Sequence, residues 1–348
     1  MKCQTKITIM RTLICILVAT ILVIISCFVG ICFPNISHAY SESKQILVIQ
    51  HQKLITYDQI FTGFLASIDK QKYIITKYNA HGNLNALDIF TDSLINQTDY
   101  DLIISLGTLG TKNIIKKEKN TPILFSGLSS PEYSGLINNW DQSSSNYSGA
   151  EIRNQTYNSL KYIHNLINFD SIGFVYLIGD PSHEGCLAEI KQIGHEAGFF
   201  VYASGIYNRD VHGKKLPNEI ISKCIKNKVE CITNKTNTFY VNLSRTFLDN
   251  FESFNNIFIK KNILSIGNNI YIEKGLVIGI SSNVYEKGKI LADYTEKILF
   301  KNIDIGSLRM DIIPKFEIEY NMKSAKKITF NPNIHFMLNV TNIQTELN

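Results

Sequence analysis

Residues 102–117, LIISLGTLGTKNIIKK, contain a short buried strand and the start of a helix, with only a tight turn between them. The run Leu102–Leu106 is apolar and includes β-branched isoleucines, which is typical of a strand covered on both faces. A turn at Gly107–Gly110 follows, and a helix is predicted from about Leu109 to Lys117. A strand that leads directly into a helix is half of a βαβ unit, which places consecutive strands parallel in one sheet.

The same alternation continues on both sides of this stretch. Apolar spacing predicts strands at Gln45–Gln50, Tyr73–Tyr78 and Ile123–Ser126, and helices at Tyr57–Lys70 and Leu84–Ile95. It stops in a polar, turn-rich segment at 141–149, which we interpret as the first crossing between two halves of the protein. The chain therefore begins with one complete α/β unit.

The alternation then starts again and predicts a second unit. The expected elements are a helix at Tyr157–Ile167, a strand at Ile172–Ile178, a helix at Ser182–Ala197, a strand at Phe199–Ala203, a helix at Leu216–Lys228, a weak strand at Cys231–Thr233, strands at Ile263–Ile266 and Leu276–Ile280, a helix at Val284–Phe300 and a strand at Phe316–Tyr320. The predicted fold class is α/β, with two Rossmann-like lobes built on parallel central sheets.

Length and charge restrict the function. The chain has 348 residues, enough for two domains, and 45% of them are hydrophobic, enough for real cores. Its formal charge is +5, but residues 1–39 hold three bases and no acid, so the remainder carries 32 basic and 30 acidic residues. This near balance predicts no general attraction for nucleic acid.

The first 39 residues have the order of a secretory signal. Lys2, Lys6 and Arg11 precede an uncharged apolar run over 12–33, and Ser37-His38-Ala39 places small residues before a candidate cleavage site. The run is also long enough to span a bilayer of about 30 Å, so an uncleaved anchor is the main alternative.

Lipidation at Cys27 is a third alternative, because Ile24-Ile25-Ser26-Cys27 is similar to a bacterial lipobox. All three alternatives keep the positive charge inside and the remaining chain outside the cytoplasmic membrane. We therefore predict an extracytoplasmic protein, in the periplasm or on the outer face of that membrane.

Three cysteines follow the leader: Cys186, Cys224 and Cys231. An odd number without a C-x-x-C motif does not make a disulfide framework. A bridge between Cys224 and Cys231 and a pair of buried thiols both remain open, and the size of the chain favours thiols.

Catalytic signatures are absent from the sequence. There is no nucleophile elbow, phosphate-binding loop, zinc-protease motif or dinucleotide fingerprint. His183 and Glu184 suggest acid–base chemistry, but Asp180-Pro181-Ser182 before them indicates a helix N-cap with Glu184 in the first turn. No histidine pair has metal-ligand spacing. We therefore predict no enzyme activity, no catalytic residue, no metal and no cofactor.

Polar residues gather where the predicted strands end. In an open parallel sheet, ligands bind beyond the carboxyl ends of the strands, and the helix N-termini there favour an anionic group such as a carboxylate. Residues predicted to contact a ligand on this basis are Gln50, His51, Asn79, Gly82, Thr108, Ser129, Ser130, Asp180 and Ser182, with Tyr285 packing on the body of the ligand. A cap or turn role is the plain alternative for each of them.

Several segments resemble one known family. They are Leu47–Gln50, Phe61–Phe64, Asn79–Asn83, Leu106–Thr108, Ser129–Leu136, Asn146–Gly149, Glu273–Gly275, Tyr285–Gly288 and Asn321–Lys326. Their order is similar to that in the substrate-binding components of ABC importers with the type I periplasmic-binding fold, in the group that includes tryptophan- and tyrosine-type binders. The resemblance covers about residues 45–332.

This resemblance implies a Venus-flytrap protein without catalysis, in which three inter-lobe crossings occur and the last returns the tail to the second lobe. It also implies a ligand residue near Asn237, where the group has a T-D-N segment. The chain departs from the group at Asn83 and Ser130, which replace acids, and at 231–255. The ligand therefore need not be an aromatic amino acid.

These observations lead to one hypothesis and one alternative. The domains expected are a signal or anchor at 1–39, an N-terminal lobe at 40–150 plus 276–304, and a C-terminal lobe at 151–275 plus 305–348. The predicted function is that of a monomeric solute-binding component of an ABC importer, which takes a small molecule, such as an amino acid or related carboxylate, to a membrane permease. The alternative is a membrane-anchored sensor or adaptor with the same fold.

Overall fold

The computed structural model describes residues 17–18, 20–21 and 43–345, except 98–99, 144 and 212–213. Lys44–Asn348 forms a compact unit distinct from Met1–Ser43. Within these described ranges, no helix is both long enough and apolar enough to span a bilayer. The leader predictions, including lipidation of Cys27, fall outside the described residues apart from 17–18 and 20–21.

The first sheet is five-stranded and entirely parallel, in the order β2-β1-β3-β4-β5. Its strands are β1 (Lys44–Gln50), β2 (Tyr73–Asn79), β3 (Leu102–Leu106), β4 (Ile123–Ser126) and β5 (Tyr147–Ala150). Its helices are α2 (Ile55–Ser67), α3 (Leu84–Gln97), α4 (Thr108–Lys117) and α9 (Val284–Lys301), with the short helix η1 (Lys70–Lys72) before β2. We call this unit the N-terminal lobe.

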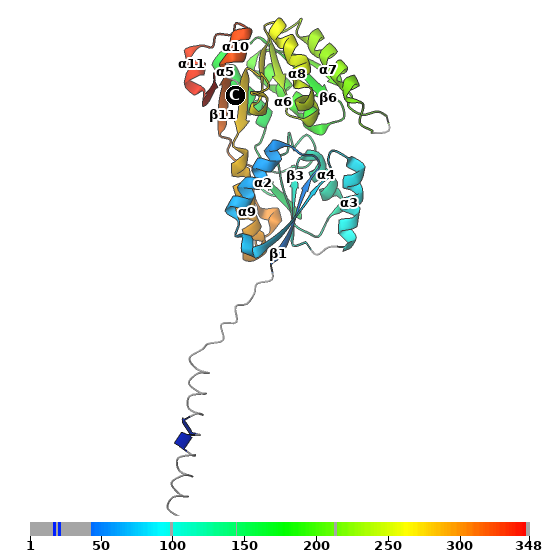
Figure 1. Ribbon diagram of the computed structural model, residues 1–348, viewed down its shortest axis with the longest axis vertical. Coiled ribbons are helices and arrows are strands. Elements are labelled where there is room, and N and C mark those ends of the chain that lie inside the picture. The colour runs from blue at the N-terminus through cyan, green and yellow to red at the C-terminus, as the bar shows by residue number, and fades with distance from the viewer. Residues whose placement is uncertain are drawn as a thin grey trace, which may run out of the picture. The chain divides into compact units, whose positions relative to one another are not determined.

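Side chains of β1 show how this sheet is covered. Ile46 and Val48 pack with α2 and α9, whereas Leu47 and Ile49 pack with α3 and α4. Figure 1 shows the two helix pairs on opposite sides of the strands. Because successive residues of a strand face opposite sides, an uninterrupted apolar run such as this one requires helices on both faces.

The second sheet has seven strands in the order β12-β11-β10-β9-β8-β6-β7, and its β10–β11 pair is antiparallel. The strands are β6 (Ser171–Leu177), β7 (Phe200–Ile206), β8 (Thr238–Val241), β9 (Leu264–Asn268), β10 (Ile278–Ser282), β11 (Phe316–Asn321) and β12 (Asn342–Gln344). The helices are α5 (Gln155–Ile167), α6 (Pro181–Ala197), α7 (Asn218–Ile232), α8 (Arg245–Lys260), α10 (Met322–Lys327) and α11 (Ile334–Asn339), with the short helix η2 (Asn269–Tyr271). A further short helix, η3 (Ile305–Ser307), follows α9 and packs against the first sheet. The sheet with helices α5–α8, α10 and α11 is the C-terminal lobe.

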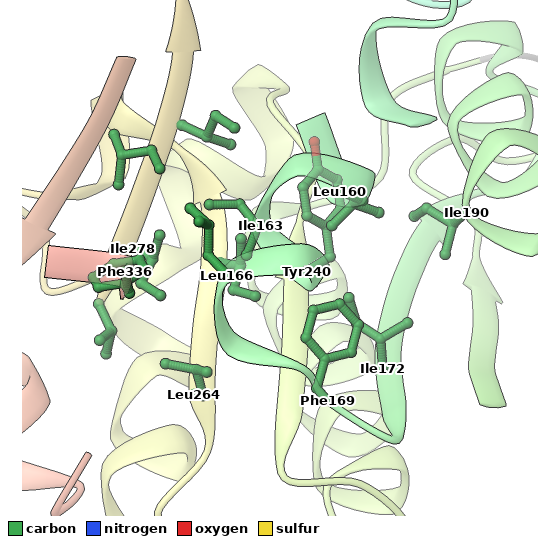
Figure 2. Packing of buried hydrophobic residues seen from close by; sticks show 14 of the residues in the cluster. Leu160, Ile163, Leu166, Phe169, Ile172, Ile190, Tyr240, Leu264, Ile278 and Phe336 are labelled. Carbon is green, nitrogen blue, oxygen red and sulfur yellow. The ribbon is translucent and has the colours of Figure 1, made fainter. Parts of the chain in front are cut away.

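Two cores flank this second sheet. One joins α5 and α6 to the strands, and Figure 2 shows Leu160 and Ile163 of α5 among Ile172, Tyr240 and Ile278. The other joins α7 and α8 and is rich in phenylalanine. The predicted α/β class with two lobes and mainly parallel sheets is thus confirmed.

Residues 231–260 differ from the sequence prediction. Cys231–Thr233 was expected to be a strand, but Cys231 and Ile232 end α7, and the strand is Thr238–Val241. The following helix, α8, was not predicted. Its buried residues Phe247, Phe251, Phe254 and Phe258 recur at helical spacing.

The three cysteines are free thiols, and Cys224 and Cys231 do not form a bridge. Cys186 is buried, Cys224 is half-buried and Cys231 is exposed, so the expectation of buried thiols is wrong for Cys231. None of these three cysteines forms a disulfide bond in the C-terminal lobe.

The chain passes between the sheets after β5, at Asn283 between β10 and α9, and before β11. Residues 147–149, which were expected within the first crossing, belong instead to a fifth strand, Tyr147–Ala150. The strand β10 belongs to the second sheet, while Ile305 and Leu308 pack in the core of the first. We therefore propose lobe boundaries at 44–150 plus 284–310 and at 155–282 plus 316–345, rather than those expected from the sequence.

A buried ion pair joins these crossings. Lys287 Nζ of α9 lies 2.6 Å from Glu151 Oε2, and the two side chains are only 3% and 1% exposed. The other oxygen, Oε1, accepts the Leu128 N–H at 2.8 Å. The Glu151 backbone also bonds to Met310 and Ile312 in the third crossing. Glu151 thus connects the first crossing both to α9 and to the third crossing.

Helices α2 and α9 touch backbone to backbone. A Cβ on Gly288 would lie 2.0 Å from the Ile60 carbonyl oxygen, and one on Gly63 would lie 2.1 Å from the Tyr285 carbonyl oxygen. Only glycine allows helices to approach so closely. The N-terminal lobe therefore depends on a tight seam with a helix from late in the chain.

Candidate ligand-binding site

Four helices begin at the facing edges of the two sheets. In the N-terminal lobe α2 follows β1 and α4 follows β3, and in the C-terminal lobe α6 follows β6 and α8 follows β8. Their first turns surround a cavity of about 70 Å³, which we call the central cavity. Its lining is His51, Gln52, Leu54, Thr56, Tyr57, Gly107, Thr108, Leu109, Gly127 and Ser129 from one lobe, and Asp180, Ser182, His183, Leu243 and Ser244 from the other.

Two buried histidines, one from each lobe, belong to this lining. His51 is 6% exposed and His183 is 1% exposed. His51 Nε2 and both ring nitrogens of His183 have no hydrogen-bond partner among the described residues. A buried polar atom without a partner costs free energy, so such atoms mark a place where a ligand is expected to supply one.

Burial keeps both rings neutral. It lowers the pKa of His51 to about 4, with a further contribution from the Arg209 guanidinium. Burial also lowers the pKa of His183, against the opposing effect of the Asp180 carboxylate. Each neutral ring carries one N–H donor and one acceptor nitrogen, so each can bind either kind of polar group.

His51 is expected to make the folded protein less stable in acid. Because its pKa falls from 6.5 to about 4 on folding, the unfolded chain binds the proton more readily. The contribution of neutral His51 to the free energy of unfolding is therefore complete above about pH 6.5. As the pH falls from there towards about 4, this contribution decreases by up to about 1.4 kcal/mol per pH unit. Urea unfolding at about pH 7.5 and about pH 5 should show a smaller loss for His51→Gln than for the wild type. The exposed His195→Gln serves as control, and an equal loss in all three proteins would contradict the assignment.

The four helix N-termini differ in how they are capped. Asp180 accepts the Ser182 N–H at the start of α6, and Ser244 accepts the Phe247 N–H at the start of α8. In the N-terminal lobe, α2 and α4 have no side-chain cap. The positive ends of α2 and α4 are therefore available to an anion, while the C-terminal lobe presents a carboxylate.

Tyr57 forms the aromatic wall of the central cavity. It is buried, and burial raises its pKa, so its hydroxyl stays protonated. Gly107 and Gly127, both at positive φ, make room for its ring, since a Cβ on Gly107 would lie 2.3 Å from the tyrosine hydroxyl oxygen. Leu54 and Leu243 complete the apolar part of the wall.

A second cavity, the side cavity, lies next to the central one and has a volume of about 80 Å³. The two share Ser129 and Leu243. The remaining lining is Ser130, Gln155, Thr156, Ser159, Tyr240, Asn242, Asn268, Ile280, Ser281, Ser282 and Phe316. Asn242 is 7% exposed, and its Nδ2 has no partner among the described residues.

A third and larger cavity, of about 690 Å³, opens beyond His51. Lys53, Arg209, Lys215 and Arg245 contribute positive charge to its lining. The Arg209 guanidinium also donates to the Gly82 carbonyl at 3.3 Å, which links the two lobes at this mouth.

A family model described as ABC transporter substrate binding protein matches residues 46–336. The chain belongs to this family. No curated protein matches the sequence.

Solved structures share the fold of this substrate-binding protein at low identity. A conserved domain protein from Vibrio cholerae has a TM-score of 0.75 at 17% identity, and an ABC domain in complex with L-Trp from Streptococcus pneumonia has 0.74 at 15%. A ligand-free, open substrate binding protein with adhesive properties from Clostridium difficile has 0.63 at 18%. Each match covers 87% of this chain and 100% of the other.

The structure brings most of the predicted ligand residues of this substrate-binding protein together. His51, Thr108, Ser129, Asp180 and Ser182 line the central cavity. Gly82 lines the third, larger cavity and Ser130 lines the side cavity. Contact between these residues and a ligand remains a proposal.

Gln50 and Asn79 end neighbouring strands but line none of these cavities. Gln50 is 1% exposed, and its Oε1 accepts a long 3.4 Å hydrogen bond from Asn79 Nδ2. They support the edge of the sheet behind His51.

Two predicted ligand residues lie elsewhere. Asn237 precedes β8, so it lies at the amino end of that strand, opposite the carboxyl end that faces the cavities. Tyr285 is in the first turn of α9, where its backbone packs on Gly63 and its ring lies 5.2 Å from Lys289 Nζ. Neither residue lines any of the three cavities described above, and ligand contact by Asn237 or Tyr285 stays a prediction.

Three cavity residues were missed by sequence reasoning. Asn242 directly follows the true strand β8 and was overlooked because that strand was placed too early. His183 was assigned to the first turn of a helix, which is correct, but its burial was not foreseen. Tyr57 carried no separate signal, since it lies within an ordinary helical pattern.

In the described part of the chain, no cluster of three or more histidine, cysteine, aspartate or glutamate side chains is placed to hold a metal ion. Asp180 is confirmed as an N-cap, and Glu184 Oε1 accepts the Gly179 N–H at 2.8 Å. Asp180 and Glu184 therefore both stabilise the start of α6, as the interpretation of this segment as a helix N-cap predicted.

Proposed function

We propose that this protein is the extracytoplasmic solute-binding component of an ABC importer and that it binds a small carboxylate, such as an amino acid, between its lobes. One observation carries the proposal. His51 and His183 come from opposite lobes and both line the cavity on which four helix N-termini converge. His51 Nε2 and both ring nitrogens of His183 are buried without a hydrogen-bond partner in the described part of the chain. Ligand binding would satisfy atoms that the protein itself leaves unsatisfied.

The capping pattern supports a dipolar solute. A carboxylate placed at the start of α4 would meet the exposed N–H groups of the first turn and the Thr108 hydroxyl, which already accepts the Ser129 N–H at 3.2 Å. An ammonium group would lie against Asp180 on the opposite lobe. The apolar wall of Tyr57 and Leu243 would cover the carbon atoms between them.

Lobe closure would follow because the carboxylate of the solute binds one lobe and its ammonium group binds the other. A solute held by both lobes stabilises the arrangement in which they meet, because it binds that arrangement better than a separated one. The Arg209 contact with the Gly82 carbonyl would form in the same step. The closed form would then dock on a membrane permease, and the basic apolar leader would direct the chain across the cytoplasmic membrane or retain it there.

Release of bound solute is the direct test of this function. The purified protein is denatured and the released small molecules are identified by mass spectrometry, and each candidate is then added back in a thermal unfolding assay. A true solute at about 100 times its Kd is expected to stabilise the protein by about 2.7 kcal/mol. The proposal is wrong if no carboxylate is released and no amino acid raises the unfolding temperature.

Replacing His183 with phenylalanine should separate binding from stability. The variant removes two unpartnered nitrogens and keeps a ring against Phe247, whose centroid lies 5.4 Å away. The unliganded protein is therefore expected to be at least as stable as the wild type, while solute affinity falls at least tenfold, or about 1.4 kcal/mol.

The control for this variant is His195→Phe, on the exposed side of the same helix. It is expected to leave the Kd measured by titration calorimetry unchanged. Unaltered affinity in His183→Phe would remove this histidine from the binding site.

A further inference from the structure

The side cavity is polar but carries no formal charge. Its walls are formed by amide and hydroxyl side chains with a few apolar ones, and no aspartate, glutamate, lysine or arginine lines it. Ser129 and Leu243 line both this cavity and the central one, so the two cavities are adjacent. The proposal below places one solute across both, with its carboxylate in the central cavity and its side chain in the side cavity.

Asn242 supplies the donor of this cavity. Its side chain is more than nine-tenths buried, and Nδ2 has no partner among the described residues. The residue is held at the end of β8, because its carbonyl oxygen accepts the Tyr271 hydroxyl at 3.0 Å. A fixed, buried N–H₂ group requires a hydrogen-bond acceptor, which a solute can provide.

An anionic group does not suit the side cavity. The start of α5 contributes Gln155 and Thr156 to the lining, but Glu189 already occupies this helix end by accepting the Tyr157 N–H at 3.0 Å. The other oxygen of Glu189 accepts the Ser130 hydroxyl. A second carboxylate here would lose its hydration next to an existing carboxylate and would meet no counter-charge.

A hydrocarbon group does not suit it either, because Asn242 Nδ2 would remain unsatisfied after closure. Sites built to hydrogen-bond a solute discriminate strongly against analogues that lack the matching group. Volume sets a further limit, since an aromatic ring the size of benzene has been accommodated in cavities of about 150 Å³. The side cavity, at about 80 Å³, has about half that volume, which favours a small group such as a carboxamide over such a ring.

We propose that the side cavity selects solutes by an uncharged group that bears a hydrogen-bond acceptor, such as a carboxamide, and that Asn242 is its specificity-determining residue. This proposal rests on the proposed function, and it narrows the solute class to carboxylates with a short, polar, neutral side chain.

Matched amino acids test this selectivity. L-glutamine, L-glutamate and L-methionine have side chains of similar length that end in a neutral polar, a charged and an apolar group, and L-asparagine, L-aspartate and L-leucine form a shorter set. Titration calorimetry on the purified wild-type protein is expected to give a Kd at least tenfold lower for the amide of one set than for its charged and apolar partners.

Substitution of Asn242 tests its role. Asn242→Leu is expected to reduce the preference for the amide over the apolar partner to about threefold or less. Asn120→Leu, on an exposed loop outside the side cavity, should keep the full preference.

The wild-type comparison needs no variant, so a folding defect in Asn242→Leu would not prevent the test. If the charged or apolar partner binds as tightly as the amide, the selectivity proposal is overturned while the proposed function stands. If none of the six binds and no carboxylate is released from the protein, the proposed function fails, and the selectivity proposal fails with it.

Discussion

Replacing Lys287 with methionine is expected to lower the free energy of unfolding by about 3–5 kcal/mol. Lys287 and Glu151 are almost completely buried, and their charged atoms are 2.6 Å apart. Removing the ammonium group leaves the Glu151 carboxylate buried with only the Leu128 N–H to stabilise its charge. Glu151 lies in the first crossing and its backbone bonds to the third, so the variant is also expected to weaken the packing of these crossings against α9. The unfolding midpoint in urea is expected to fall.

Two further variants identify the cause of this loss. The double variant Glu151→Gln, Lys287→Met removes both charges and is expected to recover much of the lost stability, since no unpaired charge remains. Lys289→Met, two residues along the same helix, breaks an exposed pair with Glu286 and should leave the midpoint essentially unchanged. A double variant that is no more stable than Lys287→Met would show that packing, rather than the unpaired charge, causes the loss.

Replacing Gly288 with alanine is expected to destabilise the protein by about 3 kcal/mol. In an exposed helix the same change would stabilise by about 1 kcal/mol, because alanine is the better helix former. Here the added methyl group would lie 2.0 Å from the Ile60 carbonyl oxygen and 2.6 Å from the Phe64 amide nitrogen. These are backbone atoms, so α2 and α9 would have to move apart along their seam.

Gly110→Ala is the matched control. Gly110 also lies in a helix, but the nearest atom to an added Cβ would be 3.6 Å away, which is an ordinary contact. This variant is expected to be neutral or slightly stabilising. Chemical denaturation of both variants gives the comparison, and equal stability in the two would contradict the tight α2–α9 seam.

Most of the fold could be predicted from hydrophobic spacing. The strand Leu102–Leu106 was placed at its observed bounds, and most of the predicted helices lie within a few residues of those in the structure. Prediction failed at 231–260, where a polar Asn/Lys/Thr segment separates a helix from a short strand. The four phenylalanines of α8 carried a helical signal, but the intervening asparagines and the misplaced strand obscured it.

Five of the fifteen residues that line the central cavity followed from one rule, that ligands meet the carboxyl ends of parallel strands. The rule located His51, Thr108 and Asp180 because each adjoins a strand end. It could not reveal which polar atoms are buried without partners, since that depends on the packing of two lobes that are distant in sequence. Asn242 and His183 emerge as binding candidates only when their neighbours are known.

The late position of α9 in the chain has a consequence for biosynthesis. A nascent chain that stops before Val284 lacks the helix that covers Ile60 and Phe64, so one face of the first sheet would stay exposed to water. Residues 155–282, the larger part of the C-terminal lobe, must therefore be synthesised before the N-terminal lobe can complete its core. A chain with this order completes its core only late in synthesis, which would suit the export proposed above.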